Sequence, residues 1–295
     1  MAGRTCEILV GTSGYSYAEW TAAGFYPPGM KQGEMLAFYA RRFPAVELNF
    51  TWYQMPRADA LDRMRRQAPP SFCFAVKLNR TLTHEVSPEG WRNDARRFRE
   101  GIAPLVQSGQ LGAVLVQLPP SFHRSPDHRR YLAALLDALA GLPLAVEFRN
   151  ASWAAGPAAE KVAAALANRR VDLVAVDAPP LPGLYPPEPL PSPGMVTHPG
   201  FFYLRLHGRN ADGWRSGRMQ QQFDYDYTEA ELREWTDARI PAMADRARRG
   251  FVFFNNHVRG QAPRNAETLM ALLAARGLPC KAPDPPSEAP PWTGP

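Results

Sequence analysis

The chain has 295 residues, of which 45% are apolar and 21% charged, and its formal net charge is +6. This size and apolar fraction are typical of a globular protein with a substantial core, built as one large domain or two small ones. No apolar run reaches the ~18 residues that a membrane-spanning helix needs, which excludes that class of membrane protein.

Three cysteines occur, Cys6, Cys73 and Cys280, which is an odd number at unrelated spacings. This pattern indicates neither a disulfide framework nor a zinc site. The first residues lack the apolar core of a signal peptide. We therefore expect a protein of the reducing cytoplasm that makes no contact with a membrane.

Short apolar runs alternate with amphipathic stretches along most of the chain. The runs predict eight strands, at residues 8–11, 45–50, 72–78, 113–118, 144–149, 173–177, 202–207 and 251–255. The stretches between them predict helices at residues 34–42, 57–67, 91–107, 128–140, 157–168, 228–249 and 263–276. We expect Pro104 to break the end of one helix and Pro241 to interrupt another, because proline lacks an amide hydrogen.

Three segments fall outside this alternation. Residues 12–30 contain five aromatic residues and are long for a plain connection, so they form a candidate binding loop. Residues 178–200 hold so many prolines that the crossover after the sixth strand cannot contain a regular helix. The proline-rich residues 279–295 are expected to be a disordered tail, which leaves a single domain at residues 1–278.

Eight strands that alternate with helices over about 270 residues match the size of a TIM-barrel-like α/β fold with an eight-stranded parallel barrel. The competing architecture is a doubly wound open sheet, which usually has a glycine-rich phosphate turn after its first strand. The corresponding segment here, GTSGYS, lacks the GxGxxG spacing, and no Walker lysine follows it. The barrel is therefore favoured.

Polar side chains stand at the ends of the predicted strands, often two positions apart and so on one face of the strand. In a barrel these ends converge on one mouth, where ligands bind. The residues expected there are Glu47, Asn49, Lys77, Gln117, Glu147, Arg149, Asp177, Arg205, His207 and Asn255. The loop residues that could cover the mouth are Thr12, Ser13, Tyr15, Trp20, Tyr53, His84, Trp153, Arg209, Asn256 and Asn265.

An ordered set of motifs resembles the YecE-like family, the domain of unknown function numbered seventy-two, across residues 9–272. These motifs are GTSGYSYAEW, FYPPGM, FYARRFPAVELNFTWYQMP, AVKLNRTLTH, VLVQLPPSF, LAVEFRNASW, AVDAP, YLRLHGR and FNNHVRGQAPRNA. The resemblance implies an uncharacterised bacterial protein with a fold similar to a TIM barrel and no assigned activity. Two positions depart from the family pattern: Trp52 stands where phenylalanine is frequent, and Asn150 where histidine often follows the EFR segment.

The charged residues of the mouth allow three interpretations. They could form an internal ion-pair ring, because buried charges need partners. They could instead line a ligand site, which such a ring would preorganise. A metal could be held by Glu47, Glu147, Asp177 and His207, but three nearby cations would repel it. We therefore expect no metal and no cofactor.

The sequence allows several roles for Lys77 and for His207. Lys77 could pair with Glu47 or Glu147, bind an anion, or act as a base or amine nucleophile if its pKa falls by burial. His207 could be a general base, a metal ligand or a hydrogen-bonded wall residue.

The leading hypothesis is a metal-independent enzyme, a hydrolase, isomerase or lyase, acting on a small anionic substrate such as a phosphorylated sugar or a nucleotide-like molecule. Its proposed catalytic residues are Glu47, Lys77, Glu147 and His207. Its proposed substrate-binding residues are Tyr15, Trp20, Asn49, Tyr53, Gln117, Arg149, Trp153, Asp177, Arg205, Arg209, Asn255, Asn256 and Asn265. Arginine forks suit phosphate or carboxylate, aromatic rings stack on sugars or bases, and amides bind hydroxyls.

The alternative is a nucleic-acid-binding protein or nuclease, based on the positive charge and on arginines at predicted helix ends. These arginines are Arg41, Arg42, Arg65, Arg66, Arg169, Arg170, Arg248, Arg249 and Arg276. Their other reading is stabilisation of the helix ends, where cations oppose the helix dipole. A third possibility is a scaffold that recruits partners through the proline-rich tail. The oligomeric state is left open.

Overall fold

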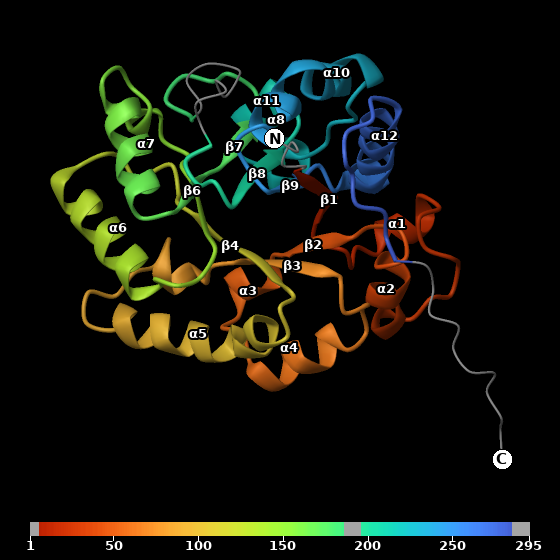
Figure 1. Ribbon diagram of the computed structural model, residues 1–295, viewed down its shortest axis with the longest axis horizontal. Coiled ribbons are helices and arrows are strands. Elements are labelled where there is room, and N and C mark those ends of the chain that lie inside the picture. Colours follow the sequence, from red (N-terminus) through yellow and green to blue (C-terminus); the bar gives the residue numbers. More distant parts are fainter. Residues whose placement is uncertain (1–5, 186–195, 285–295) are drawn as a thin grey trace, which may run out of the picture.

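The computed structural model describes residues 6–185 and 196–284, and its core is one parallel sheet surrounded by helices (Figure 1). The sheet has nine strands in the order β6-β5-β4-β3-β2-β1-β9-β8-β7. Their bounds are β1 (Glu7–Ser13), β2 (Ala45–Leu48), β3 (Cys73–Lys77), β4 (Leu111–Gln117), β5 (Leu144–Glu147), β6 (Asp172–Leu173), β7 (Ala175–Asp177), β8 (Phe201–Leu206) and β9 (Arg249–Phe254). The TIM-barrel-like parallel fold is confirmed, with nine strands rather than the predicted eight.

The extra strand arises where the sheet nearly closes on itself. β6 and β7 stand at opposite ends of the strand order, yet only Val174 separates them in the chain. β6 pairs with β5, and β7 pairs with β8, so each half of the predicted strand 173–177 bonds to a different neighbour. Side chains bridge part of the remaining gap: the amide of Tyr203 on β8 donates to Asp172 Oδ2 (2.8 Å), and that of Leu173 to Thr197 Oγ1 (2.9 Å).

The interior of the barrel is packed by unequal contributions from its two sides. β2 to β5 each direct an alanine inward, namely Ala45, Ala75, Ala113 and Ala145, with Leu115 as the larger exception, whereas β8 and β9 direct large rings, namely Phe201, Tyr203, Phe251 and Phe253. All nine are buried. Because interiors are close-packed, the large rings of one side fill the volume that the alanines of the other leave open.

The helices predicted outside the barrel are present, with ends shifted by a few residues. They are α2 (Gln32–Tyr39), α4 (Ala58–Arg65), α5 (Trp91–Gln107), α6 (Pro126–Ala138), α7 (Ala158–Asn168) and α12 (Gln261–Ala275). Pro104 does not break α5, which runs to Gln107. The helix predicted at 228–249 is divided into α10 (Glu229–Glu234), a π-helical turn (Trp235–Arg239) and α11 (Ile240–Ala244). The division falls just before Pro241, which cannot donate a helical hydrogen bond.

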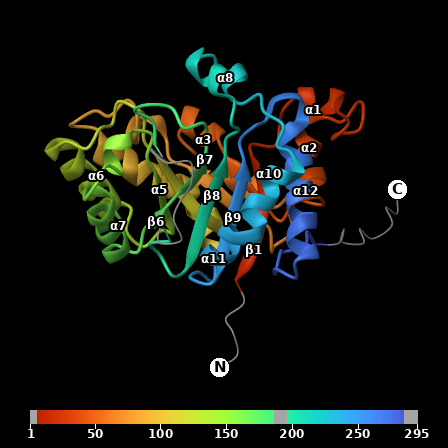
Figure 2. The same ribbon diagram turned by 90° about the horizontal axis from the view of Figure 1, so that it is seen from above.

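Among the described residues, four short α-helices were not predicted: α1 (Glu19–Ala22), α3 (Phe50–Tyr53), α8 (Ala211–Arg215) and α9 (Met219–Gln222). They follow the carboxyl ends of β1, β2 and β8. Figure 2 shows α8 projecting from one end of the barrel, on the same side as α1 and α3. These helices therefore build up the rim of the mouth at which the functional residues were expected.

Two of the unusual segments are described in part. The crossover after the sixth predicted strand has no helix in its described residues, 178–185 and 196–200, and its middle lies outside them. The first residues of the predicted tail, 279–284, are described: Cys280 forms a bridge to Ile8, whose amide donates to Pro279 O (2.8 Å). The remaining tail, 285–295, lies outside the described residues. No helix in the described part of the chain is long and apolar enough to cross a membrane.

Candidate functional site

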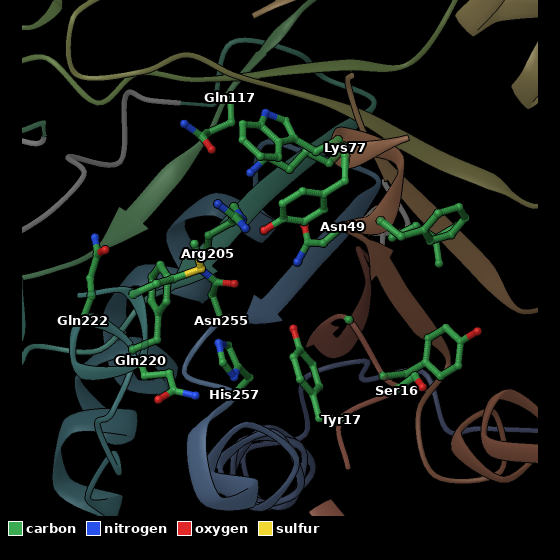
Figure 3. A pocket seen from close by; sticks show the side chains of 18 of the residues that line it. Ser16, Tyr17, Asn49, Lys77, Gln117, Arg205, Gln220, Gln222, Asn255 and His257 are labelled. Atoms are coloured by element: carbon green, nitrogen blue, oxygen red, sulfur yellow. The ribbon is translucent and has the colours of Figure 1, made fainter. Parts of the chain in front are cut away.

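A cavity of about 910 Å³ lies at the carboxyl ends of the strands. Figure 3 shows Asn49, Lys77, Gln117, Arg205 and Asn255 converging on it from the strand ends, with Tyr17, His257, Gln220 and Gln222 around it. Of the predicted site residues, eight line it: Tyr15, Asn49, Tyr53, Lys77, Gln117, Arg149, Arg205 and Asn255. Their convergence follows from the barrel, which brings the ends of distant strands to one mouth.

The charge of the lining is one-sided. Three cations line the cavity, Lys77, Arg149 and Arg205, and none of the described lining residues is an aspartate or a glutamate. Two predicted catalytic carboxylates, Glu47 and Glu147, lie behind this surface and are fully buried (0% exposed). The acids therefore support the site from below and do not face a ligand.

Arg205 takes up both of these carboxylates. Its Nε and Nη2 donate to the two oxygens of Glu47 at 2.9 and 2.7 Å, and its Nη1 donates to Glu147 Oε2 at 2.7 Å. Such forked, charge-assisted bonds fix the guanidinium plane. Tyr203 adds a hydrogen bond from its hydroxyl to Glu47 Oε2 (2.7 Å). The ion-pair ring considered from the sequence is thus present around Arg205.

Arg149 and His207 complete the ring on the side of Glu147. Arg149 pairs with Glu147 Oε1, and His207 Nε2 lies 3.3 Å from the same oxygen and 3.1 Å from Arg149 Nη2. Asn255 Nδ2 lies 3.0 Å from the other imidazole nitrogen. Burial, reinforced by Arg149, lowers the pKa of His207 to about 3, so its imidazole is neutral at physiological pH. Burial alone would raise the pKa of Glu147, but Arg149 and Arg205 hold it well below its ordinary value.

Lys77 is the cation of the cavity lining that takes no part in the ion-pair ring. Its Nζ lies 5.2 Å from the centroid of the Trp52 ring and makes no hydrogen bond or ion pair with any described residue. The salt bridge to Glu47 or Glu147 considered from the sequence is not formed, because the arginines occupy these carboxylates. Burial, and then the charge of Arg205, lower the pKa of Lys77 to about 7.

Two further polar atoms of the lining have neither a hydrogen-bond partner nor an ion-pair partner among the described residues. Asn49 Oδ1, an acceptor, and Trp214 Nε1, a donor, are both buried and unbonded. Buried polar atoms without partners are uncommon in folded proteins. Together with the Lys77 amine, they give the cavity hydrogen-bonding capacity that the protein itself does not use.

Apolar side chains form two of the cavity walls. The first wall belongs to α3, where Phe50 and Tyr53 are 37% and 53% exposed, and the second to α8 and α9, where Met219 is 58% exposed. Tyr17 and His257 stack face to face at 4.6 Å between ring centroids. Such walls suit a flat or partly apolar ligand body above the charged floor.

Sequence reasoning missed most of these wall residues. They are Ser16, Tyr17, Gln32, Phe50, Trp52, Trp214, Met219, Gln220, Gln222, Phe223 and His257. His84, which was expected among the loop residues that could cover the mouth, does line the cavity. A signal existed for the second wall: the stretch between residues 208 and 227 is long for a connection and carries Trp214, Met219 and Phe223 among polar residues.

The structure places two predicted site tryptophans in the packing. Trp20 is fully buried, donates from Nε1 to His257 O (2.7 Å) and packs on Phe25 and Tyr26. Trp153 stacks on Phe148 at 4.3 Å and donates to Phe122 O (2.6 Å). Neither ring lines the cavity, and each indole N–H is satisfied by a backbone carbonyl.

Four predicted polar residues also lie elsewhere. Val174, Val176 and Ala178 face the barrel interior, so strand alternation turns Asp177 outward, toward the helices. There it accepts hydrogen bonds from Arg209, Trp235 Nε1 (2.8 Å) and the Tyr227 hydroxyl (3.0 Å). Asn256 and Asn265 bond to each other at 2.7 Å and to the backbone of the segment that leads into α10, namely Tyr225 and Tyr227.

The metal set considered from the sequence is not assembled. Glu47 and Glu147 are bonded to Arg205, and Asp177 points to the other side of its strand. Within residues 6–185 and 196–284, no group of three or more His, Cys, Asp or Glu side chains could hold a metal ion.

Comparison with known proteins agrees with the resemblance inferred from the motifs. The family model described as "Protein of unknown function DUF72" matches residues 9–290. The UPF0759 protein YunF of Bacillus subtilis (strain 168) is 26% identical over 275 residues, which cover 90% of this chain and 94% of that protein. The UPF0759 protein YecE of Escherichia coli (strain K12) is 28% identical over 176 residues, 59% of this chain and 60% of that protein.

Solved structures of the same family share the fold. The crystal structure of a DUF72 family protein from Thermotoga maritima is 34% identical in sequence, with a TM-score of 0.80, and the match covers 91% of this chain and 99% of that chain. A DUF72 family protein from Enterococcus faecalis V583 is 26% identical, with a TM-score of 0.81, and the match covers 96% of this chain and all (100%) of that chain.

Proposed function

This chain belongs to the DUF72 family of proteins of unknown function, and on that premise we propose that it is an enzyme whose barrel mouth binds a small organic anion. The observation that carries the proposal is the lining of the cavity, with three cations and no carboxylate among its described residues. In a protein with 28 acidic residues, this segregation favours a negatively charged ligand.

The residues fall into three proposed roles. Lys77 and Arg149 contact the anionic group, since both line the cavity and Lys77 has no partner among the described residues. Glu47, Glu147 and His207, which were predicted to be catalytic, instead position Arg205 and Arg149 from behind. The walls of α3 and α8–α9 hold the body of the ligand, so a phosphorylated sugar or a nucleotide-like molecule fits the arrangement. Lys77 is the group on which the chemistry depends.

The arginines at helix ends give less support to the alternative, nucleic-acid binding. Most of those expected to form a patch pair with acids: Arg42 with Glu267, Arg65 and Arg66 with Asp62, Arg169 with Asp137, Arg249 with Glu7, and Arg276 with Asp237. Paired arginines have less charge to offer a phosphate backbone.

Ligand-induced thermal stabilisation tests the proposal. Inorganic phosphate, sugar phosphates and nucleoside monophosphates should raise the melting temperature of the wild type in a saturable way, because a ligand that binds only the folded state stabilises it. Lys77→Met should abolish this rise, whereas the exposed-lysine control Lys161→Met should retain it. Equal stabilisation of both variants, or none of the wild type by any of these anions, would contradict an anion site at Lys77.

A further inference from the structure

We propose that Lys77 is an amine nucleophile that forms an imine with a carbonyl group of the bound anion, so that the substrates of this site are anionic aldehydes or ketones. This inference rests on the proposed function, because the anion site is what brings the carbonyl to the amine.

The amine of Lys77 lies where it can meet a bound ligand. Lys77 ends β3 and lines the cavity floor, while both nearby carboxylates are held by Arg205 and Arg149. A lysine kept only to bind charge would pair with an acid when one is within reach, as the two arginines do. Instead its amine stays unpaired, against the face of Trp52, and open to the cavity.

Burial and the charges around the amine of Lys77 lower its pKa. Arg205 and Arg149 oppose its protonation, Glu47 and Glu147 favour it, and burial outweighs both carboxylates, which brings the pKa to about 7. The imidazoles of His84 and His207 are neutral, because burial lowers their pKa values to about 4 and about 3. A large fraction of Lys77 is therefore uncharged at neutral pH, and the uncharged amine is the nucleophilic form.

The arginines and the lysine on the cavity floor have different chemical properties. The arginines cannot lose their charge and act as fixed anchors for a carboxylate or phosphate. Lys77, in contrast, can donate an electron pair. An anchor beside a nucleophile holds a reacting carbonyl in place, and such positioning supplies much of the rate of covalent catalysis.

Imine formation joins the amine to the carbonyl carbon and releases one molecule of water. The lone pair of Nζ attacks the carbonyl carbon, and the carbonyl π electrons move to oxygen, which takes the proton released by the nitrogen. The resulting carbinolamine loses its hydroxyl group with one proton as water and forms a carbon–nitrogen double bond. Protonation of that nitrogen gives an iminium ion, which draws electrons from the neighbouring carbon. No oxidant or reductant is consumed.

Reductive trapping on the full chain tests the inference. The protein is incubated at about pH 7.5 with glycolaldehyde phosphate or with uncharged glycolaldehyde, reduced with cyanoborohydride, digested and analysed by mass spectrometry. The chain has only four lysines, Lys31, Lys77, Lys161 and Lys281, so each site is quantified in the same sample. Lys77 should be labelled roughly tenfold faster than Lys161, whose amine is largely protonated at this pH. Inorganic phosphate should slow labelling at Lys77 alone.

The variants Lys77→Arg and Lys161→Arg serve as a matched pair. The first keeps the positive charge and should lose the Lys77 adduct with no gain elsewhere, and the second should leave the Lys77 adduct unchanged. If Lys77→Arg fails to fold, the wild-type peptide map still decides, because it compares lysines within one chain.

The possible failures are distinguishable. Labelling of Lys77 no faster than that of Lys161 overturns the imine, even where phosphate still raises the melting temperature and the anion site stands. Fast labelling at Lys77 that is equal for both aldehydes and insensitive to phosphate overturns the anionic substrate class and, with it, the proposed function.

Discussion

Two charged centres stand at the ends of strands β3 and β7, which are not neighbours in the sheet, and their hydrogen-bonding capacity is met in opposite ways. Asp177, at the end of β7, faces the helices and accepts hydrogen bonds from three side chains, Arg209, Tyr227 and Trp235. Lys77, at the end of β3, faces the cavity and bonds to no described residue. Both were expected at the mouth from the sequence.

The difference separates a structural charge from a functional one. A buried charge whose bonding capacity is filled by the fold has no need of a ligand, and its removal harms stability. A buried charge left without partners costs stability and persists where a ligand or a reaction uses it. Mutation of the two centres should therefore have opposite effects on stability: substitution of Asp177 should lower the free energy of unfolding, and substitution of Lys77 should not.

The largest loss of stability is expected for Asp177→Asn. The amide keeps the shape but removes the negative charge opposite Arg209, and breaking a buried ion pair costs about 3 kcal/mol or more. Urea unfolding should show this loss, while stabilisation by phosphate persists in the variant. A variant that keeps its stability but is no longer stabilised by phosphate would show that Asp177 serves ligand binding and not the stability of the fold.

Glu147→Gln should cost a comparable amount, on the order of 2–3 kcal/mol, because Arg149 loses its carboxylate partner while Arg205 keeps Glu47. The loss should depend on pH. Since the folded-state pKa of Glu147 lies below its unfolded value, its stabilisation is present above the unfolded pKa and disappears as pH falls through the folded pKa. Unfolding curves of wild type and variant should therefore converge in acid. A gap between them that stays constant down to acidic pH would show that the charge of Glu147 is not what stabilises the fold.

Lys77→Met should show no loss of stability and a gain of roughly 1 kcal/mol, because an apolar side chain replaces a desolvated amine. The folded-state pKa of Lys77 is below its unfolded value, so the cost of burying the ammonium is largest below about pH 7 and disappears above the unfolded pKa. The gain should shrink accordingly as pH rises. A clear loss of stability in this variant would mean that the amine has a structural partner.

The smallest effect is expected for Asp172→Asn at the opposite end of the barrel. Burial raises the pKa of Asp172 well above its ordinary value, although Oδ2 accepts a backbone hydrogen bond. A raised folded-state pKa means that stability falls as pH rises through it. The asparagine should remove this decline and stabilise the protein by about 1 kcal/mol in alkaline buffer. Parallel pH profiles for the two proteins would rule this account out.

The sequence by itself determined the barrel, the position of nearly every strand, and the gathering of polar strand ends at one mouth. It could do so because hydrophobic periodicity and strand–helix alternation are local patterns. Eight of its candidate site residues line the cavity, and they sit at strand ends or close after them. Trp20, Trp153 and Asp177 do not line it. For Asp177 the reason is that the run LVAVD is apolar on both faces and does not say which face turns inward.

Only the tertiary structure decided which buried charges find partners. Arg205 reaches from β8 to Glu47 on β2 and Glu147 on β5, three strands that are far apart in the chain. Pairing of this kind depends on side-chain reach across a closed barrel, which no local pattern records. Because the arginines satisfy both carboxylates, the fold leaves Lys77 as the unpaired group, and that is where we expect the chemistry of this protein to occur.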